Sequence, residues 1–431
     1  MKKYFGTDGI RGVYGEGLDC ETAFLLGAAI GKAFGGDCVV GMDTRLSGGA
    51  LFEALAAGLN ASGARALCVG VLPTPAVSFL VDRWDLNFGV MITASHNPPS
   101  YNGLKVFARG GLKLSEGQES EIEKLMEFER KRGNSYIGWL KKNKGLNVLH
   151  QMALDEAKAL YIQELIDEFN EGAFCGLKVL LDSGHGAAGA VAGEVFLKLG
   201  ASVKSINDGG DGEWINANCG TEHIKGLLDR EDIAEFDLAF AFDGDADRTC
   251  VIVGGKILDG DSLLYSLSKS VHLKDGVVLG TLMSNSALER KLKSEQKELV
   301  RVPVGDKYIL DAMVKSGYSL GGEQSGHYIF YPKRKTGDGI LTALMVCVAF
   351  MRGELEFLEL LPQRTVSLKA ERALLDDERV RQWIDGTSGK VESLLVRMSG
   401  TEPKVRISVE DEDEAVVDAV VSEFLELIRG I

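Results

Sequence analysis

Ser95 and His96 stand side by side in the chain, and Lys105 lies ten residues after Ser95. The apolar run Leu86–Ala94, directly before them, predicts a buried strand, and Leu104–Phe107 predicts a returning strand. In open α/β sheets, ligands bind at the carboxyl ends of the strands. A serine hydroxyl beside an imidazole, with an amine nearby, is suited to covalent catalysis through an activated nucleophile. Taken alone, the Ser-His-Asn sequence could also be a polar turn that closes the strand.

A second set of candidate residues is acidic and follows the predicted buried strand Asp237–Phe242. Three aspartates occupy alternate positions of this loop: Asp243, Asp245 and Asp247. Alternate aspartates can converge on one hard cation, and three carboxylates with open positions suit Mg²⁺ held jointly with a phosphate. An EF-hand is excluded because its sixth and twelfth positions, which need Gly and Glu, are Arg248 and Gly254. Three carboxylates this close repel one another unless something neutralises them. We therefore favour a metal loop over a solvated acidic turn, with Arg248 offsetting charge and contacting phosphate.

Two loops combine glycine with arginine. Phe5–Gly12 holds three glycines, which permit sharp turns and close approach to a ligand, and Arg11 offers a planar donor fork suited to phosphate. Near the other end of the chain, two arginines, two hydroxyls and a glycine form a predicted phosphate nest. Its candidate ligands are Arg397, Ser399, Gly400, Thr401 and Arg406. The alternatives are a glycine-rich loop with a surface arginine and a basic hairpin turn.

The segment Gly321–His327 places a carboxylate, a hydroxyl and an imidazole between glycines, at Glu323, Ser325 and His327. Such groups can pair with the vicinal hydroxyls of a sugar. A capped polar turn is the alternative.

The spacing Gly184-x-Gly186-x-x-Gly189 has the form of a dinucleotide fingerprint, with a predicted strand before it and a predicted helix after it. We give it little weight, because glycines also serve tight strand–helix turns and close packing. It keeps a nucleotide-dependent oxidoreductase open as a rival hypothesis.

The elements that must position these residues alternate between strand and helix. Strands are predicted at Cys38–Met42, Ala66–Val71 and Phe88–Ala94, with helices at Glu21–Phe34 and Ala50–Ala61, which indicates a largely parallel sheet covered by helices. Two similar units follow, and a small α+β unit begins near residue 366. We predict an α/β protein with three consecutive α/β domains, whose sheets are mixed or parallel, and a C-terminal α+β domain. The predicted boundaries are 1–150 with the serine loop, 151–250 with the acidic loop, 251–364 with the sugar-binding segment and 365–431 with the phosphate nest.

The bulk properties narrow the class of protein. The 431 residues are 45% hydrophobic and 26% charged, and the net charge of −15 disfavours nucleic acid, which requires a basic face. Local Arg and Lys still allow an anionic small substrate. The seven cysteines form no CxxC pair, as expected for reduced thiols of a cytoplasmic protein. The N-terminus lacks the apolar core of a signal peptide, and the longest apolar helix, Ile340–Met351, is too short to span a bilayer, so no membrane role is expected.

The motifs together resemble those of a known family. Thr93–Pro98, with Asn102, Gly103 and Lys105, resembles the active-serine loop of the α-D-phosphohexomutases. The family's other motifs follow in the expected order, at Phe5–Gly12, Asp243–Arg248, Gly322–His327 and Arg397–Arg406. Within the family, Gly322–His327, Thr336–Gly339 and Asn216–Gly220 are most similar to the bacterial phosphoglucosamine mutases.

The resemblance implies an isomerase that interconverts glucosamine 6-phosphate and glucosamine 1-phosphate, supplying amino-sugar precursor for UDP-N-acetylglucosamine and cell-wall synthesis. Phosphorylated Ser95 would donate its phosphate to the sugar, giving a 1,6-bisphosphate as intermediate and activator, and would then take back the other phosphate. One Mg²⁺ per chain would be held by the three aspartates and by an oxygen of the phosphoserine. Glu323 and Ser325 would hold the C3 and C4 hydroxyls, and the loop at 397–406 would hold the phosphate that is not reacting. Lys105 and His327 are unranked candidates for general acid and base, and His96 and Arg11 complete the catalytic set.

Two departures from the family pattern keep alternatives open. Tyr101 stands where many phosphoglucosamine mutases have Asp, and Met398 stands where Pro is frequent. The alternative activity is that of a phosphomannomutase/phosphoglucomutase. A non-catalytic sugar-phosphate binding protein is a rival of a different class. We expect a small phosphosugar as partner and a monomer or a homodimer.

Overall fold

The computed structural model describes residues 3–6, 8–143, 150–370, 372–398 and 404–429. The chain divides into two compact units. The first unit is Met1–Asp259 with Ser325–Gly353, and the second is Gly260–Gln324 with Glu354–Ile431.

The first sheet of the first unit has strand order β1-β2-β6-β5-β3-β4-β8, with β7 paired to β6. Its strands are β1 (Phe5–Gly6), β2 (Gly9–Val13), β3 (Asp37–Met42), β4 (Arg65–Val71), β5 (Phe88–Ile92), β6 (Tyr101–Ala108), β7 (Leu112–Lys113) and β8 (His150–Met152). The strands β3, β4, β5 and β8 are parallel, whereas β1, β2, β6 and β7 pair antiparallel with their neighbours. The sheet is therefore mixed, and the predicted serine loop is the connection between β5 and the returning strand β6.

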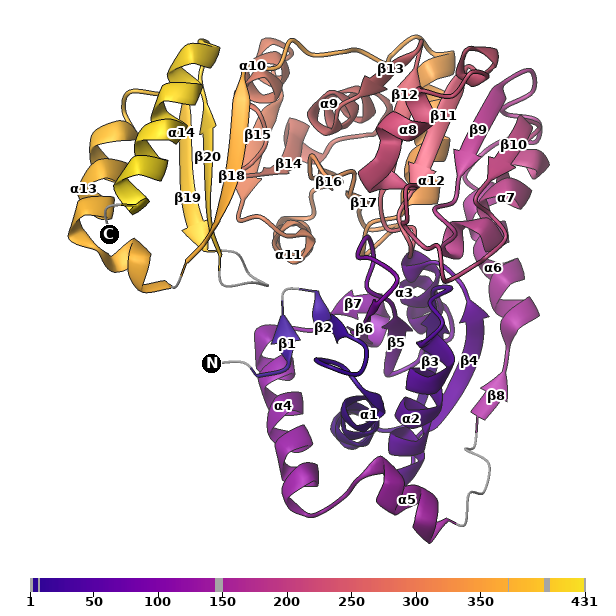
Figure 1. The fold of residues 1–431 in the computed structure, drawn as a ribbon. Helices are drawn as coiled ribbons and strands as arrows, with labels where there is room; N and C mark the ends of the chain where they lie inside the picture. The colour runs from indigo at the N-terminus through magenta and orange to yellow at the C-terminus, as the bar shows by residue number, and fades with distance from the viewer. Residues whose placement is uncertain (1–2, 7, 144–149, 371, 399–403, 430–431) are drawn as a thin grey trace. The chain divides into compact units, whose positions relative to one another are not determined.

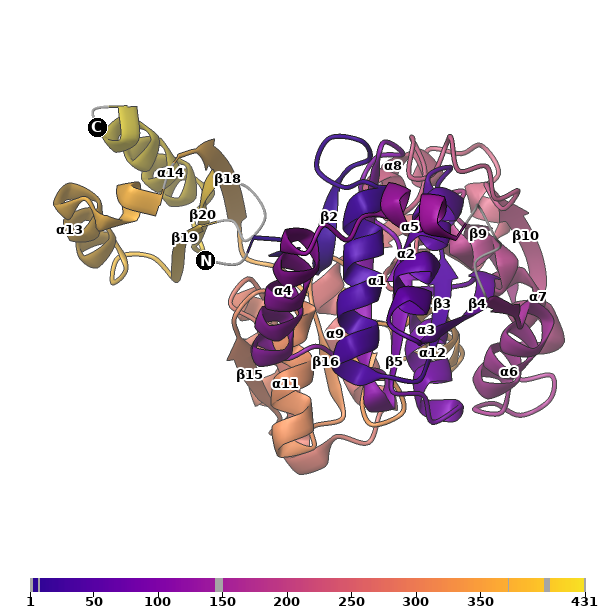
Figure 2. The same cartoon turned by 90° about the horizontal axis from the view of Figure 1, so that it is seen from below.

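Helices cover both faces of this sheet. They are α1 (Cys20–Phe34), α2 (Gly48–Ala61), α3 (Thr74–Arg83), α4 (Glu116–Lys131) and α5 (Tyr136–Lys142). Figure 2 shows α1 beside α2 and α4. The axes of α1 and α2 approach closely because Gly27 and Gly58 face the neighbouring backbone. A Cβ at Gly27 would lie 2.2 Å from the Leu55 carbonyl oxygen, and one at Gly58 would lie 2.1 Å from that of Phe24. A capping box formed by Ser115 and Gln118 begins α4.

The second sheet of the same unit has strand order β10-β9-β11-β12-β13. Its strands are β9 (Lys178–Asp182), β10 (Ser202–Ile206), β11 (Leu238–Phe242), β12 (Thr249–Val253) and β13 (Lys256–Leu258). The accompanying helices are α6 (Leu154–Ile166), α7 (Ala192–Lys198), α8 (Ile224–Leu228) and α12 (Gly339–Met351), the last of which follows the short strand β17 (Tyr328–Phe330). The hairpin of β12 and β13 belongs to this sheet, which thus ends at Leu258, and the distant helix α12 packs on β11 and β12.

The second unit contains a parallel sheet in the order β15-β14-β16 and an antiparallel sheet in the order β18-β20-β19. The strands are β14 (Val277–Thr281), β15 (Glu298–Val302), β16 (Leu320–Gly322), β18 (Gln363–Lys369), β19 (Ser393–Met398) and β20 (Lys404–Glu410). The helices are α9 (Gly260–Ser270), α10 (Ser286–Ser294), α11 (Asp306–Ser316), α13 (Glu378–Thr387) and α14 (Glu414–Arg429). Figure 1 shows α13 and α14 on one face of the antiparallel sheet, where Val380, Ile407 and Phe424 are fully buried. These sheets and helices confirm the predicted fold class.

Among the described residues, no helix combines the length and the apolar character needed to cross a membrane.

Candidate active site

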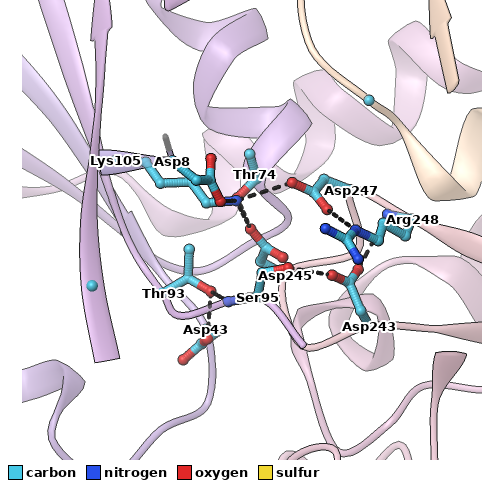
Figure 3. Close-up of polar contacts among 12 residues, drawn as sticks. Asp8, Asp43, Thr74, Thr93, Ser95, Lys105, Asp243, Asp245, Asp247 and Arg248 are labelled. Atoms are coloured by element: carbon cyan, nitrogen blue, oxygen red, sulfur yellow. Dashed lines mark hydrogen bonds and ion pairs between the residues drawn. The ribbon is translucent and has the colours of Figure 1, made fainter. Parts of the chain in front are cut away.

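The carboxyl ends of two strands meet at Ser95. Strand β5 ends at Ile92, and Ser95 follows it in the buried loop; strand β11 ends at Phe242, and Asp243 follows it. The Ser95 hydroxyl donates a hydrogen bond of 2.7 Å to Oδ2 of Asp243, as Figure 3 shows. The side chain of Ser95 is almost completely buried, with 1% of the residue exposed. The two loops that the sequence singles out therefore form one site.

The three aspartates of the acidic loop are buried, and one carboxylate oxygen of each lies within 4.8 Å of those of the other two. Burial, together with the charges of Asp247 and Asp245, raises the pKa of Asp243 well above its ordinary value. Within the described part of the chain, Oδ1 of Asp245 is buried without a hydrogen-bond partner. Since an unpaired carboxylate oxygen is costly to bury, this donor set fits a divalent cation.

Lys105, on β6, lies against the same cluster. Its Nζ is 2.8 Å from Oδ2 of Asp245, 3.0 Å from Oδ2 of Asp247 and 3.1 Å from Oδ2 of Asp8. Burial by itself would lower the pKa of Lys105, but Asp245, Asp247 and Asp8 raise it well above its usual value. The amine is therefore charged and held by three carboxylates.

Asp8, which sequence reasoning missed, joins Arg11 to this cluster. Its carboxylate contacts Nη2 of Arg11 at 2.5 Å and Nζ of both Lys105 and Lys113 at 3.1 Å. Burial would raise the pKa of Asp8, but Lys105, Lys113 and Arg11 hold it well below its usual range. The position of this carboxylate, three residues before Arg11 in the same glycine-rich loop, was the signal that could have identified it.

His96 lies beside the nucleophile. Its Nδ1 is 3.2 Å from the Ser95 hydroxyl oxygen. Burial, together with the positive charges of Arg248 and Arg11, lowers the pKa of His96 to about 3. The imidazole is consequently neutral at physiological pH.

His327 directly precedes β17, and its imidazole lies beside Asp247 of the acidic loop. The backbone N–H of Gly337 donates to its Nε2 at 3.0 Å, and its Nδ1 is 3.7 Å from Oδ1 of Asp247. Because Nε2 accepts this hydrogen bond, the ring proton belongs on Nδ1, toward the carboxylate. This arrangement favours an orienting role for His327 over transfer of a proton.

The acidic loop is also fixed through Arg248 and Thr74. The backbone N–H of Arg248 donates to Oδ1 of Asp243 at 3.1 Å, and its Nε is 3.9 Å from Oδ1 of Asp247. Thr74, the first residue of α3, donates its hydroxyl to Oδ2 of Asp245 at 2.5 Å and its N–H to the Asp245 carbonyl at 2.9 Å. The positive end of the α3 dipole thus faces the cluster. Sequence reasoning missed Thr74, because nothing in its local sequence links it to a loop so far along the chain.

The Gly184–Gly189 loop backs the acidic loop. The N–H of Ala187 donates to the Gly244 carbonyl at 2.9 Å, and a Cβ at Gly186 would lie 2.4 Å from that carbonyl oxygen. These glycines permit close approach of two backbones, which explains the spacing without a dinucleotide.

The remaining candidates lie mainly in the second unit. Oε1 of Glu323 accepts a hydrogen bond from the Gly305 N–H at 3.0 Å. Arg397 and Arg406 face each other in the register of β19 and β20, and burial followed by the charge of Arg406 lowers the pKa of Arg397. Within the described residues, Nε of Arg406 is buried without a hydrogen-bond partner. Two adjacent arginines with an unused donor are an arrangement that suits an anion.

Ser325 is an exposed residue of the first unit. The predicted phosphate ligands Ser399, Gly400 and Thr401 lie outside the described residues.

Comparison with known proteins decides the family. The chain matches four domain models of the phosphoglucomutase/phosphomannomutase family: α/β/α domain I over residues 2–133, domain II over 159–256, domain III over 259–365 and the C-terminal domain over 353–427. The chain belongs to this family. The resemblance inferred from the motifs is thereby confirmed.

Curated relatives share most of their length with this chain. A phosphoglucosamine mutase of Thermotoga neapolitana is 40% identical, with 99% of each chain covered. A phosphoglucosamine mutase of Clostridium beijerinckii is 39% identical, with 100% of this chain and 99% of the relative covered.

Solved structures share the fold. A phosphoglucomutase/phosphomannomutase family protein of Burkholderia thailandensis superposes with a TM-score of 0.77 at 23% identity, covering 99% of this chain and 96% of the other. The N-acetylphosphoglucosamine mutase of Aspergillus fumigatus, in complex with GlcNAc-6P and magnesium, has a TM-score of 0.67 at 18% identity, with 99% and 96% covered.

Proposed function

We propose that this protein is a phosphosugar mutase that interconverts glucosamine 6-phosphate and glucosamine 1-phosphate through a phosphorylated Ser95. The observation that carries the proposal is the hydrogen bond between the Ser95 hydroxyl and Asp243 inside a buried cluster of three aspartates. The full-length similarity to proteins named phosphoglucosamine mutase supports the amino sugar as substrate.

In the proposed reaction, the bond between Ser95 Oγ and phosphorus breaks while a sugar hydroxyl forms a bond to the same phosphorus. The sugar hydroxyl gives up its proton, and the departing Ser95 oxygen takes one up and becomes a hydroxyl. The resulting 1,6-bisphosphate then changes its orientation in the site, so that its other phosphate faces Ser95. The Ser95 hydroxyl then attacks the other phosphorus and gives up its proton, while the bond between that phosphorus and the sugar oxygen breaks. The sugar oxygen takes up a proton and leaves as a hydroxyl, and phosphoserine is regenerated. Because such transfers depend on positioning and charge stabilisation, the residues around Ser95 must hold the phosphoryl group in place.

The chain's own charges are arranged for this task. Arg11 and Arg248 contribute positive charge beside the cluster, and Lys105 is held between Asp245 and Asp247. Since Lys105 is charged and fully ion-paired, we assign it charge stabilisation rather than proton transfer. The neutral His96 lies within reach of the Ser95 hydroxyl.

Asp243, Asp245 and Asp247 are the proposed ligands of one Mg²⁺, which when bound would neutralise charge on the transferring phosphoryl group. Asp245→Asn should weaken Mg²⁺ binding by the unphosphorylated protein at least ~10-fold, because it removes one carboxylate charge from the site. Titration calorimetry with Mg²⁺ measures this directly. Asp208→Asn, which alters an exposed aspartate outside the cluster, is the matched control. Equal Mg²⁺ affinity in both variants would remove the metal assignment.

In the second unit, we assign Arg397 and Arg406 to the phosphate that is not reacting and Glu323 to the sugar hydroxyls. Two observations support the first assignment: Arg397 and Arg406 lie opposite each other on β19 and β20, and Nε of Arg406 is buried with no hydrogen-bond partner among the described residues. Ser325, Ser399, Gly400 and Thr401 complete the proposed substrate contacts on the strength of the family motif.

The substrate is tested by assaying glucosamine, glucose and mannose 1-phosphates side by side on enzyme loaded with phosphate beforehand. Discrimination between an amine and a hydroxyl is large where a site's polar groups would be left unpaired. We expect kcat/KM for the glucosamine phosphate to exceed the others by at least ~10-fold, which corresponds to about 1.4 kcal/mol. Equal or faster turnover of mannose 1-phosphate would instead assign a phosphomannomutase/phosphoglucomutase. Binding of all three sugars without turnover would indicate a non-catalytic binding protein.

A further inference from the structure

Ser95 has a backbone conformation that its own side chain does not favour. Its φ is 52°, in the left-handed region that residues with a Cβ seldom occupy. Residues held in this region persist only where the surroundings determine the conformation, and they gather at functional sites. The contacts that hold Ser95 therefore determine where its hydroxyl points.

Arg45 makes the most extensive of these contacts. It follows β3 and has a fully buried side chain. Its Nη2 donates to the carbonyl oxygens of Ser95 at 2.9 Å and Asn97 at 2.7 Å, and its Nη1 donates to those of Pro98 and, at 2.8 Å, Tyr101. One guanidinium thus binds three carbonyls of the loop between β5 and β6 and the carbonyl of Tyr101, the first residue of β6.

Asp43 holds this guanidinium in place and is also linked, through Thr93, to the backbone N–H of Ser95. Its Oδ2 accepts from Nε of Arg45 at 3.0 Å and from the Thr93 hydroxyl at 2.7 Å. The Thr93 oxygen in turn accepts the N–H of Ser95 at 2.8 Å. Figure 3 shows the link from Asp43 through Thr93 to Ser95. Both peptide groups that flank the Ser95 Cα are held by this network.

Asn216, in the segment between β10 and β11, binds the same carbonyl. Its Nδ2 donates to the carbonyl oxygens of Ser95 at 2.8 Å and Asn97 at 3.1 Å. Asn216 is itself left-handed, with a φ of 58°, and its N–H donates to the Gly184 carbonyl at 3.0 Å. The Asn216–Gly220 motif and the Gly184 loop are thereby tied to the nucleophile.

We propose that Arg45 and Asn216 are positioning residues of the mutase reaction, which clamp the Ser95 carbonyl and so direct the Ser95 hydroxyl to Asp243. The inference rests on the proposed function, since it concerns the transfer of phosphate to and from Ser95. In the described part of the chain, neither side chain forms a hydrogen bond to the acidic cluster, so each acts through the serine loop.

Asn216→Gly is the sharpest test. Glycine adopts the left-handed conformation without strain, so the change removes the two side-chain hydrogen bonds and spares the backbone. Asn218→Gly is the matched control, because Asn218 is also left-handed, with a φ of 55°, and lies two residues further along the same loop. Arg45→Lys is a second variant, which keeps the charge beside Asp43 but cannot bind four carbonyls.

The readouts are kcat, KM and the amount of phosphate on Ser95 after incubation with glucosamine 1,6-bisphosphate, measured by intact mass. A nucleophile misplaced by about 1 Å costs roughly 10²-fold in rate. We expect kcat of Asn216→Gly and Arg45→Lys to fall about 10²-fold while KM changes by less than about 3-fold. Asn218→Gly should match the wild-type enzyme in all three.

The outcomes distinguish a failure of the proposed function from a failure of the proposed clamp on the Ser95 carbonyl. A wild-type enzyme that carries no phosphate on Ser95 would refute the proposed function. If the wild-type enzyme loads and turns over, the clamp is overturned by a folded Asn216→Gly variant whose kcat stays within about 3-fold of wild type. A loss confined to KM, or an equal loss in Asn218→Gly, would overturn it as well.

Discussion

Replacing Gly244 with alanine should disturb the site by a small and defined distance. Gly244 lies between Asp243 and Asp245, and its φ is not left-handed, so alanine meets no backbone strain there. The added Cβ would instead lie 2.7 Å from the Ser95 carbonyl oxygen and 3.0 Å from Nδ2 of Asn216. Ordinary contact begins at 3.4 Å, so the serine loop and the acidic loop must separate by about 0.7 Å.

This separation moves the Ser95 hydroxyl away from the Asp243 carboxylate, and the reaction must keep these two groups together. A displacement of about 1 Å costs roughly 10²-fold in rate, so about 0.7 Å should cost 10- to 100-fold in kcat, or about 1.4 to 2.7 kcal/mol. The KM for the sugar phosphate should change little, because its proposed contacts lie elsewhere.

A steady-state mutase assay of Gly244→Ala beside Gly226→Ala measures the effect. A Cβ at the exposed Gly226 would have no heavy atom within 4 Å, so that variant should keep wild-type kinetics. The reasoning is refuted if the folded Gly244→Ala enzyme has a kcat within about 3-fold of Gly226→Ala.

Three further predictions follow from the charges. Lys105→Met leaves Asp245 and Asp247 without their ammonium partner, so it should lower the free energy of unfolding of the metal-free protein by about 3 kcal/mol. Urea titrations measure this loss, and Mg²⁺ should restore part of the lost stability. An equal loss of stability with and without Mg²⁺ would contradict the prediction. In the unphosphorylated, metal-free protein, the imidazole of His96 should titrate in NMR near its pKa of about 3 and not near 6.5. Because the unfolded state then binds a proton that the folded state does not, stability should be lost as the pH falls from 6.5 toward 3. His96→Gln should weaken this dependence of stability on pH. An NMR titration midpoint near 6.5 would exclude the lowered pKa of His96. Arg406→Ala should raise the KM for sugar phosphate about 10-fold or more with a smaller effect on kcat, and an unchanged KM would remove Arg406 from the phosphate site.

Local patterns in the sequence were sufficient for the elements that carry a strong signal. The apolar runs before Ser95 and Asp243 are strands β5 and β11. Strand β10 was not predicted, because its sequence, Ser-Val-Lys-Ser-Ile, has too few apolar residues to distinguish it from a loop. No local signal shows that the apolar helix α12 packs on a sheet formed about a hundred residues earlier.

The site could be predicted only as far as residue type and spacing allow. Ser95 and Asp243 were singled out separately, but their hydrogen bond joins positions 148 residues apart, and only the topology brings them together. Arg45 resembles any charged residue that follows a strand, and its role becomes visible only when its four carbonyl partners are known. Lys105 was singled out as an amine near Ser95. Its pairing with Asp8, Asp245 and Asp247, on which its proposed role in charge stabilisation depends, requires burial that the sequence does not contain.

The proposed function depends on Ser95 as the residue that carries the phosphate. The most direct measurement is intact mass with site mapping of the wild-type enzyme during turnover of glucosamine phosphate, with Ser95→Ala as comparison. We expect one phosphate on Ser95 of the wild-type enzyme, none at this position in the variant, and a loss of at least ~10³-fold in turnover by the variant. Near-normal turnover by Ser95→Ala, or a working wild-type enzyme whose phosphate lies on another residue, would contradict it.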